Sequence, residues 1–455
     1  MPPKRKQSWT AYLDEPVDGA SLGVFRIVFG AMVAIDAYRY VTNGWVEEYF
    51  VRPKLHFTYL YFGWVHPLPA PWIYGHFYFI GAMAVLVSLG LFYRWACVGL
   101  FLSYTYFFLL EQSTYMNHYY LIALISFLLC TMPAQRCYSL DRLRGATVER
   151  SVPRWCVLIL RFQLFVVYFY GAIAKLNPDW LAGEPMYSEL VRGGPEIPEI
   201  ANLLPPAILA YAIAYSGVLI DTAVPIMLST RSLRRYGFLL AVGFHVLNAI
   251  FLRIGVFSYL MVGAITIFFD ADWPRQLARR CSSLIGRHPS QPRLVVREGH
   301  TRWPLFALLY FYVALQLLVP FRHLLFPGPV SWTEEGHRFA WQMKLRKKRS
   351  RIVITARDPA TGRTWTIDPN ADLIARQQRK LATFPDIMLQ YAHYTRDRLV
   401  REGIADPEIR VDYMCSLNGA PYAPLIDPQV DLAKVERTWR HSWWILPKPP
   451  RRTEP

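Results

Sequence analysis

The chain has 455 residues and a formal net charge of +17 at pH 7, a length that would allow about three soluble domains. Charged residues make up 45 of positions 1–320 (14%) but 38 of positions 321–455 (28%). Because an ordinary globular domain has roughly 25% charged residues, the composition excludes a uniformly soluble protein. It predicts a membrane-embedded body followed by a polar domain. The positive charge lies largely in short loops between apolar segments, so we expect no nucleic-acid partner.

A membrane-spanning helix needs about 20 mostly apolar residues. Nine segments meet or nearly meet this requirement: 22–41, 72–91, 95–110, 113–132, 155–175, 207–228, 236–251, 254–270 and 303–320. The seventh and eighth are short and meet at Leu252–Gly255, so they form either a tight helical hairpin or a partly re-entrant pair. The N-terminus lacks a short apolar core with a small-residue cleavage site, so we expect no cleavable signal peptide.

The orientation follows from the short loops, because basic loops are retained on the cytoplasmic side. With the N-terminus inside, the inner segments hold 19 Lys or Arg residues and the outer loops hold 4. This asymmetry predicts a cytoplasmic N-terminus, and nine spans then place the C-terminal domain outside the cytoplasm. We therefore expect a cytoplasmic tail at 1–21, a transmembrane helical domain at 22–320 and an extracytoplasmic α+β domain at 321–455.

The C-terminal domain shows the alternation of apolar and polar residues that is typical of strands. The predicted strands are Phe339–Leu345, Arg351–Ala356, Thr364–Ile367 and Ile409–Leu417. A turn at Asp358–Gly362 joins the second and third strands, and a helical stretch from about Ala371 to Arg401 precedes the fourth. The six cysteines show neither a CxxC pair nor metal-ligand spacing, so we interpret them as small buried residues and expect no metal.

Lys175 ends the fifth span. Its position fits an interfacial lysine whose ammonium group reaches water. It also fits a lysine in a dry site, where desolvation favours the neutral amine and makes it a usable general base. Ionisable groups inside spans are costly, which makes each of them a candidate for function.

Further polar residues lie in the outer halves of the predicted spans. Asn117 and His118 belong to the fourth span, which its length requires to begin near Ser113, and His245 and Asn248 share one face of the seventh. Each could simply make helix-to-helix hydrogen bonds. Their common depth with Lys175 instead predicts one polar pocket, next to the outer domain, for a lipid-soluble and a water-soluble substrate.

Two other pairs of charged residues are interpreted as structural. Asp36 and Arg39 are three residues apart near the outer end of the first span and predict an ion pair. Arg161 and Asp221 lie nearer the inner side, where we expect buried pairing.

Seven stretches, in order along the chain, resemble the vitamin K-dependent γ-glutamyl carboxylase family, whose membrane domain is shared with the wider HTTM group. They are RPKLHFTYLYFGWVHPLP (52–69), YMNHYYL (115–121), RFQLFVVYFYGAIAKLNPDWLAGEPM (161–186), FHVLNAIFLRIGVFSYLM (244–261), HRFAWQMKLR (337–346), DPATGR (358–363) and SLNGAPYAPLIDPQVDL (416–432). The chain differs from the animal enzymes in having Ala174 in place of a second lysine and in lacking their extra C-terminal segment.

The resemblance implies an enzyme that oxidises vitamin K hydroquinone with dioxygen to the epoxide. The base formed in that reaction would remove a γ-proton from a peptide glutamate, which then captures carbon dioxide. The resemblance makes Lys175 the base towards the hydroquinone, with His118 and Asn117 beside the reacting oxygens. Its implied partners are a glutamate-containing peptide or secreted protein and membrane lipid.

The resemblance also implies binding residues. Tyr168, two helical turns before Lys175, is expected to line the same pocket, and Trp341, Gln342 and Met343 are expected to reach the naphthoquinone from the outer domain. Together with these, His245 and Asn248 complete the expected vitamin K site. Arg379 and Lys380 would pair with the substrate carboxylate.

Two other functions stay open on the sequence. One is a quinol epoxidase or quinol-handling oxidoreductase that carboxylates no protein. The other is a transporter or scaffold, which is disfavoured because no internal repeat is visible and the polar residues gather near one face.

Overall fold

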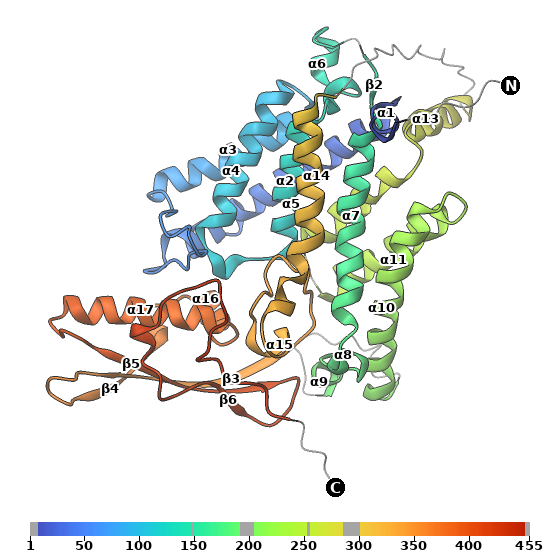
Figure 1. Ribbon diagram of the computed structural model, residues 1–455. Helices are drawn as coiled ribbons and strands as arrows, with labels where there is room; N and C mark the ends of the chain where they lie inside the picture. Colours follow the sequence, from blue (N-terminus) through green and yellow to red (C-terminus); the bar gives the residue numbers. More distant parts are fainter. Residues whose placement is uncertain (1–7, 148, 192–203, 253–254, 285–300, 451–455) are drawn as a thin grey trace.

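The computed structural model describes residues 8–147, 149–191, 204–252, 255–284 and 301–450. A bundle of long helices occupies one part of the molecule, and a sheet domain from the C-terminal residues covers one end of that bundle (Figure 1). The predicted combination of an α-helical membrane protein with a small α+β unit is confirmed at this level.

The bundle helices lie at the positions of the predicted spans. They are α2 (Ala20–Thr42), α3 (Ala70–Leu89), α4 (Tyr93–Leu110), α5 (Asn117–Thr131), α7 (Arg154–Lys175), α10 (Pro206–Ser229), α11 (Arg234–Leu252), α12 (Val256–Ala264) with the 3-10 turn η5 (Ile265–Phe268), and α14 (Trp303–Leu318). Five of them are long and apolar enough to cross a membrane: α2, α3, α7, α10 and α14, the last continued by a 3-10 turn to Leu325. A sixth is possible if the segment from α12 to α13 (Trp273–Leu284), bent by 91°, is one span.

Nine spans are thus not confirmed, because the other helices are shorter or less apolar. The helix α5 has 15 residues and is about 22 Å long, which is less than the roughly 30 Å of a hydrocarbon layer. The junction of the seventh and eighth spans, expected as a tight hairpin or a partly re-entrant pair, includes residues 253–254, which lie outside the described residues.

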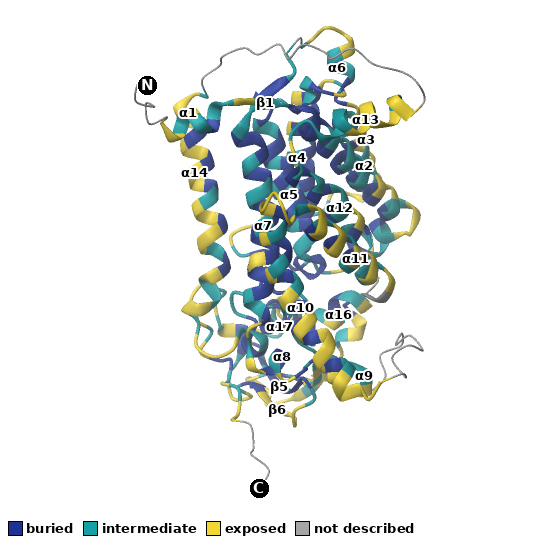
Figure 2. Ribbon diagram, turned by 90° about the vertical axis from the view of Figure 1, so that its right-hand side faces the viewer, coloured by how far each residue is buried: buried dark blue, intermediate teal, exposed yellow. Residues whose placement is uncertain are grey.

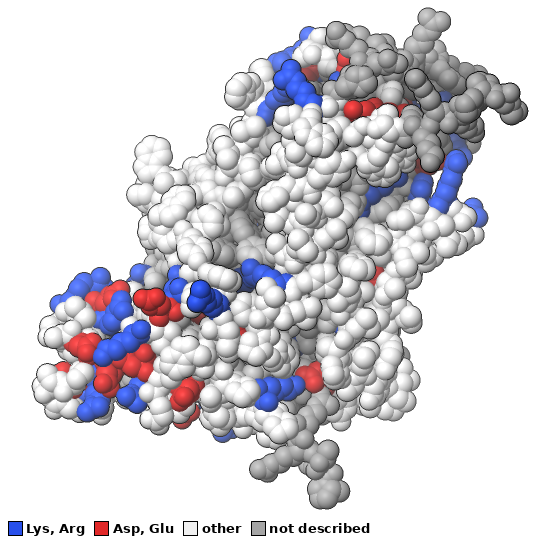
Figure 3. All heavy atoms as spheres, viewed as in Figure 1, with Lys and Arg blue, Asp and Glu red and all other residues white. Residues whose placement is uncertain are grey.

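The lateral surface of the bundle is apolar. The outer faces of α14 and α11 are largely exposed (Figure 2), and the exposed side chains on them include Leu239, Ile250, Phe311 and Leu318. In the view of Figure 3, charged side chains gather over the C-terminal domain and at the far end of the bundle, with an uncharged band between them. Such a band is the surface expected of a protein in a bilayer.

The C-terminal domain is a four-stranded antiparallel sheet in the order β4–β3–β5–β6. Its strands are β3 (Lys348–Arg357), β4 (Thr364–Ile367), β5 (Glu408–Leu417) and β6 (Ala423–Ile426). The helices α16 (Ala375–Leu381) and α17 (Pro385–Arg401) lie between this sheet and the bundle (Figure 1). The predicted single helix is broken at Ala382–Phe384, where Pro385 starts a new helix because it lacks a backbone N–H.

The predicted strand at Phe339–Leu345 is wrong. The backbone of Phe339, Trp341 and Lys344 has positive φ angles of 65°, 55° and 56°, which a strand does not permit. The alternation arises instead because Trp341 and Leu345 are buried while Lys344 is exposed. This irregular segment runs from the sheet domain to the end of the bundle.

Candidate active site at the membrane junction

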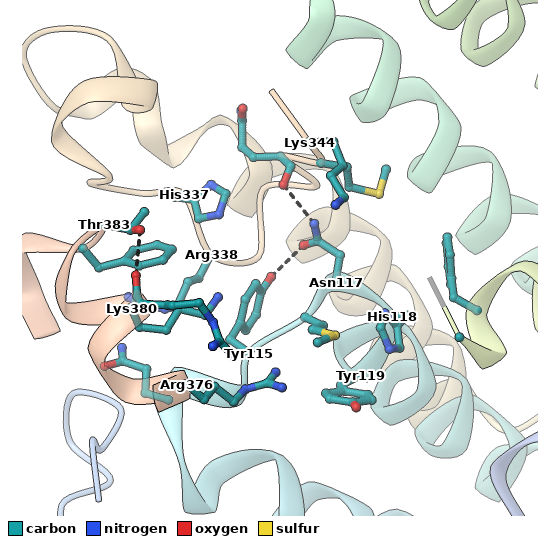
Figure 4. Close-up of a pocket in the computed structure, with 18 of the residues that line it drawn as sticks. Tyr115, Asn117, His118, Tyr119, His337, Arg338, Lys344, Arg376, Lys380 and Thr383 are labelled. Atoms are coloured by element: carbon teal, nitrogen blue, oxygen red, sulfur yellow. Dashed lines mark hydrogen bonds between the residues drawn. The ribbon is translucent and has the colours of Figure 1, made fainter. Parts of the chain in front are cut away.

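A cavity of about 670 Å³ lies where the bundle meets the C-terminal domain. Its walls come from α2, the start of α5, the start of α12, the irregular segment 337–348 and α16 (Figure 4). The sequence-predicted residues Asn117, His118, Met343, Arg379 and Lys380 line it. Residues more than 200 positions apart in the chain therefore share one site.

Asn117 is the first residue of α5, which begins later than the expected start near Ser113 because the residues Gln112–Thr114 form a separate 3-10 turn. Its side-chain oxygen accepts a hydrogen bond from the Tyr115 hydroxyl (2.8 Å), and its side-chain nitrogen donates to the Gln342 carbonyl (3.0 Å). Tyr115 also accepts a bond from the Phe339 backbone N–H (2.7 Å). These bonds, two of them drawn in Figure 4, fix the segment 337–348 onto α5.

His118 lies deeper in the cavity, against the ring of Phe257 at a centroid distance of 5.6 Å. Phe257 also contacts His245 (6.1 Å), whose Nε2 is 2.7 Å from the Tyr168 hydroxyl. His245 and Tyr168 are buried behind Phe257 and are not among the residues lining the cavity. The Nδ1 atom of His245 is buried without a hydrogen-bond partner among the described residues.

Lys175 also lies behind the cavity wall, in a buried ion pair. Its Nζ is 2.5 Å from Oδ2 of Asp221 on α10, and the two side chains are 9% and 5% exposed. The ammonium group also donates to the Gly171 carbonyl (3.3 Å) and lies 5.5 Å from the Trp180 ring centroid. Lys175 is therefore not an interfacial lysine in contact with water, and Asp221 is a site residue that sequence reasoning placed elsewhere.

The expected pairing of Arg161 with Asp221 near the inner side is wrong. Arg161 donates to the carbonyls of Ile267 and Phe269 (2.9 Å each). The first turns of α10 extend beyond the end of α7, where the Trp180 indole donates to the Ala214 carbonyl (2.8 Å). As a result, Asp221, further along α10, lies level with Lys175 at the end of α7. The predicted pair of Asp36 and Arg39 is confirmed at 3.3 Å.

Met343 separates the cavity from the buried pair. Its side chain lines the cavity, while its Cε lies 3.3 Å from the point where a Cβ on Gly171 would be. The same point is 2.9 Å from Oδ2 of Asp221. A flexible methionine is thus the wall between the cavity and Lys175.

The opposite wall is strongly basic and surrounds the ring of Phe384. Arg338 lies 4.8 Å, Lys380 5.2 Å and Arg346 5.4 Å from the Phe384 centroid. Two of these cations have acidic partners, since Arg338 contacts Asp386 (2.7 Å) and Arg346 binds Glu334 through both carboxylate oxygens. The wall thus has two neutralised cations that stiffen it.

Lys380 is the exception on this wall, since none of the ion pairs found among the described residues includes it. Burial, together with the neighbouring Arg376, Arg338 and Arg346, lowers the pKa of Lys380 to about 7. The amine is therefore half protonated near neutral pH and is ready to receive an anion. Arg379, on the same helix, is exposed at the cavity edge.

The remaining predicted residues lie outside the lining of the cavity. Trp341, within the segment 337–348, is buried, and its ring centroid is 5.2 Å from that of Tyr120. Its indole N–H has no partner among the described residues. Asn248 is partly buried on α11. In the described ranges, no three His, Cys, Asp or Glu residues are placed to hold a metal ion.

Comparison with known protein families assigns both parts of the chain. The HTTM domain matches residues 14–273, more than half of the chain. The chain belongs to the HTTM family. The lumenal domain of vitamin K-dependent gamma-carboxylase matches residues 302–451, a range that includes α14 and the whole sheet domain of this HTTM protein. The two matches together confirm the resemblance to the carboxylase family seen in the sequence. No solved structure matches the chain.

Proposed function

We propose that this HTTM protein is a vitamin K-dependent γ-glutamyl carboxylase. It would oxidise vitamin K hydroquinone with dioxygen to the epoxide and carboxylate a peptide glutamate with carbon dioxide. The observation that carries the proposal is a single cavity with an apolar, membrane-side wall and a basic, domain-side wall. Such a cavity suits a lipid-soluble and an anionic, water-soluble substrate that must meet.

The residues present fit a hydroquinone with an apolar tail. The cavity volume of about 670 Å³ lies within the roughly 300–1,000 Å³ of small-molecule sites. Met116, Val256, Phe257 and Met343 supply apolar contacts, and the ring of His245, whose buried Nδ1 has no partner among the described residues, contacts Phe257. When bound, reduced vitamin K with dioxygen would supply the strong base for the carboxylation.

Asn117 and His118 support the oxygen chemistry in this proposal. The amide of Asn117 is held from both sides by Tyr115 and Gln342, so its orientation is fixed before any substrate binds. His118 presents its ring beside Phe257 without a hydrogen bond to other described side chains. Fixed polar groups at this position would stabilise negative charge that develops on a bound hydroquinone oxygen.

Lys175 would be the base towards the hydroquinone, and Asp221 would hold its proton. A lysine in contact with a carboxylate at 2.5 Å can release its proton along an existing hydrogen bond. Movement of Met343 would bring this pair into contact with the cavity, because Met343 is the side chain between them. Water would stay excluded, as a carbanion requires.

On the other side, Lys380 and Arg379 would bind the carboxylate of the substrate glutamate. The paired cations Arg338 and Arg346 would keep the Phe384 surface rigid beneath it. We further propose that the N-terminus is cytoplasmic and that this site opens on the outer face of the membrane, as the loop charges predict.

The test incubates purified protein in lipid nanodiscs with vitamin K hydroquinone, dioxygen, ¹⁴C-bicarbonate and a short glutamate-rich peptide. Epoxide and fixed label are measured separately, and both are expected. Epoxide without label, repeated over peptides of different length, would indicate the quinol epoxidase alternative. If neither product forms with a folded protein, the proposed oxygen chemistry is wrong.

A further inference from the structure

A second cavity, of about 440 Å³, lies at the end of the bundle away from the sheet domain. Its lining comes from the first half of α2, the end of α3, Arg150 and α13, and from residues 137–140, 142 and 143, the last of which belong to the short helix α6 (Leu140–Leu143). In Figure 1, α6 and α13 are at the opposite end of the molecule from the strands of the C-terminal domain. This cavity is therefore separate from the site described above.

The lining of this cavity has one sign of charge. It includes Arg142, Arg150 and Arg275 and no Asp or Glu among the described residues. Arg275 is held in place, since it donates to Oδ2 of Asp18 (2.8 Å) and to the Cys137 sulfur (3.3 Å). Three guanidinium groups around one hollow are a site for an anion with several oxygen acceptors, because each group offers several N–H donors in a fixed plane.

Arg142 adds to this arrangement. It donates to the carbonyls of Arg136 (3.3 Å) and Glu149 (3.0 Å), which orients its side chain along the wall. Burial and the nearby charge of Arg150 lower the pKa of Arg142. The cations thus repel one another, and an anion bound between them would relieve that repulsion.

The rim of the cavity is apolar and exposed. Leu89, Tyr138 and Leu143 are 45%, 42% and 81% exposed, respectively. An inorganic anion would leave these side chains uncovered, whereas acyl chains would cover them. The occupant that satisfies both features has a phosphate head group and a hydrocarbon tail.

We propose that this cavity binds an anionic phospholipid, with Arg142, Arg150 and Arg275 around the phosphate and the Leu89 and Leu143 side chains against the acyl chains. The proposal does not depend on the function of the first site. Basic pockets at the ends of transmembrane helices are suited to such head groups, and each arginine contributes about fivefold in affinity at a membrane surface.

The test incorporates the full chain into vesicles of equimolar phosphatidylcholine and phosphatidylglycerol. The protein is then extracted in mild detergent, and the lipids that stay bound are measured by mass spectrometry. We expect phosphatidylglycerol to be enriched over phosphatidylcholine, Arg150→Gln to reduce the enrichment about fivefold, and Arg150→Lys to restore most of it. Arg280→Gln is the matched control, because Arg280 is exposed on α13 and does not line the cavity.

Four results would overturn the proposal. The first is an absence of enrichment in the unaltered protein. The second is an equal loss in Arg280→Gln, which would indicate diffuse surface charge, and the third is an enrichment that Arg150→Gln leaves unchanged. The fourth comes from a further arm with millimolar glycerol 1-phosphate, in which full displacement of the lipid by this soluble compound would show a site for free phosphate. Thermal unfolding of each variant in phosphatidylcholine alone verifies that it is folded.

Discussion

At the scale of single residues, Lys175 and Asp221 are two opposite charges buried together, so removal of either leaves the other without its partner. Breaking a buried pair in this way typically costs about 3–5 kcal/mol. The inactivity of Lys175→Ala would therefore have two explanations, loss of a base and loss of the fold. A useful variant must keep the positive charge while removing the ability to give up a proton.

Lys175→Arg meets that requirement, because a guanidinium stays protonated at all working pH values. We expect this variant to fold and to lose epoxide formation by about 100-fold or more, the contribution of a general base. Arg161→Lys is the control, since it changes a half-buried cation on the same helix whose hydrogen bonds within the described residues go to backbone carbonyls. Epoxide formation in Lys175→Arg within tenfold of the original rate would contradict the assignment of the base.

The pairing itself gives a second prediction. Lys175→Ala should lower the free energy of unfolding by about 3–5 kcal/mol, and adding Asp221→Asn should recover a large part of this loss, because no buried charge then stays unpaired. Chemical denaturation in detergent micelles measures both. Equal stabilities of the single and double variants would show that Asp221 is not the partner of Lys175.

Lys380 gives a prediction about pH. Its pKa of about 7 means that the amine is charged below neutral pH and neutral above it, where it no longer attracts a carboxylate. The KM for the peptide should therefore rise as pH increases from 6 to 9, with an inflection near or above 7, because a bound carboxylate raises the pKa of the lysine. Lys380→Arg should remove the inflection. Arg379→Gln should raise KM at every pH and leave the inflection in place. An inflection that persists in Lys380→Arg would exclude this role.

At the scale of elements, the site depends on how closely α7 and α10 approach each other. Gly171 and Gly217 are at their contact, and a Cβ on Gly217 would lie 3.3 Å from the Trp180 ring and 3.5 Å from Cε of Lys175. Small residues at this crossing let Lys175 and Asp221 meet. The short helix α8 (Pro178–Leu181) then connects α7 to the C-terminal domain, because Asp179 accepts hydrogen bonds from Asn418 and Lys448 (3.2 Å each).

Gly171→Ala tests this packing. The new methyl group would lie 2.9 Å from Asp221 and 3.3 Å from Met343, so it should displace both. We expect a destabilisation of about 1–3 kcal/mol and a loss of epoxide formation on the order of 100-fold, the effect of misplacing a reacting group by about 1 Å. Gly243→Ala on α11 has open space around the added methyl group and should change neither quantity. Equal effects of the two substitutions would contradict the importance of this contact.

At the scale of the whole molecule, the first cavity and the basic cavity lie at opposite ends of a bundle with an uncharged band on its surface (Figures 1 and 3). A membrane across that bundle would put the two cavities on its two sides. The proposed orientation assigns the sheet domain to the outer side and α13 to the inner side.

Cysteine labelling in intact cells tests this orientation. Thr361 is exposed at the turn between β3 and β4, and the native Cys281 is exposed on α13. A membrane-impermeant maleimide should label Thr361→Cys in a Cys281→Ser background without permeabilisation. It should label the native Cys281 only after the membrane is opened. The reverse pattern would invert the proposed topology. Labelling of both sites in intact cells would contradict a bundle that separates them across the membrane.

The sequence alone determined the membrane class, the positions of the bundle helices, and the strands Thr364–Ile367 and Ile409–Leu417 to within a residue or two. These features follow from the composition and periodicity of short stretches of sequence, so no contact between distant residues is needed to predict them. The sequence also showed two motifs of the site, the one with Asn117 and His118 and the basic stretch 337–346. Their contact across the cavity was not visible, because it depends on hydrogen bonds between residues 225 positions apart.

Only the tertiary structure decided which charges pair. The sequence placed Asp221 by counting residues from the end of its span, whereas its real depth depends on how far α10 extends beyond α7. Similarly, Phe339–Leu345 alternates like a strand, but Trp341 packs against Tyr120 of α5, Gln342, Met343 and Lys344 line the cavity, and positive φ angles bend the backbone. Side-chain pattern records which residues are buried, and it does not record what buries them.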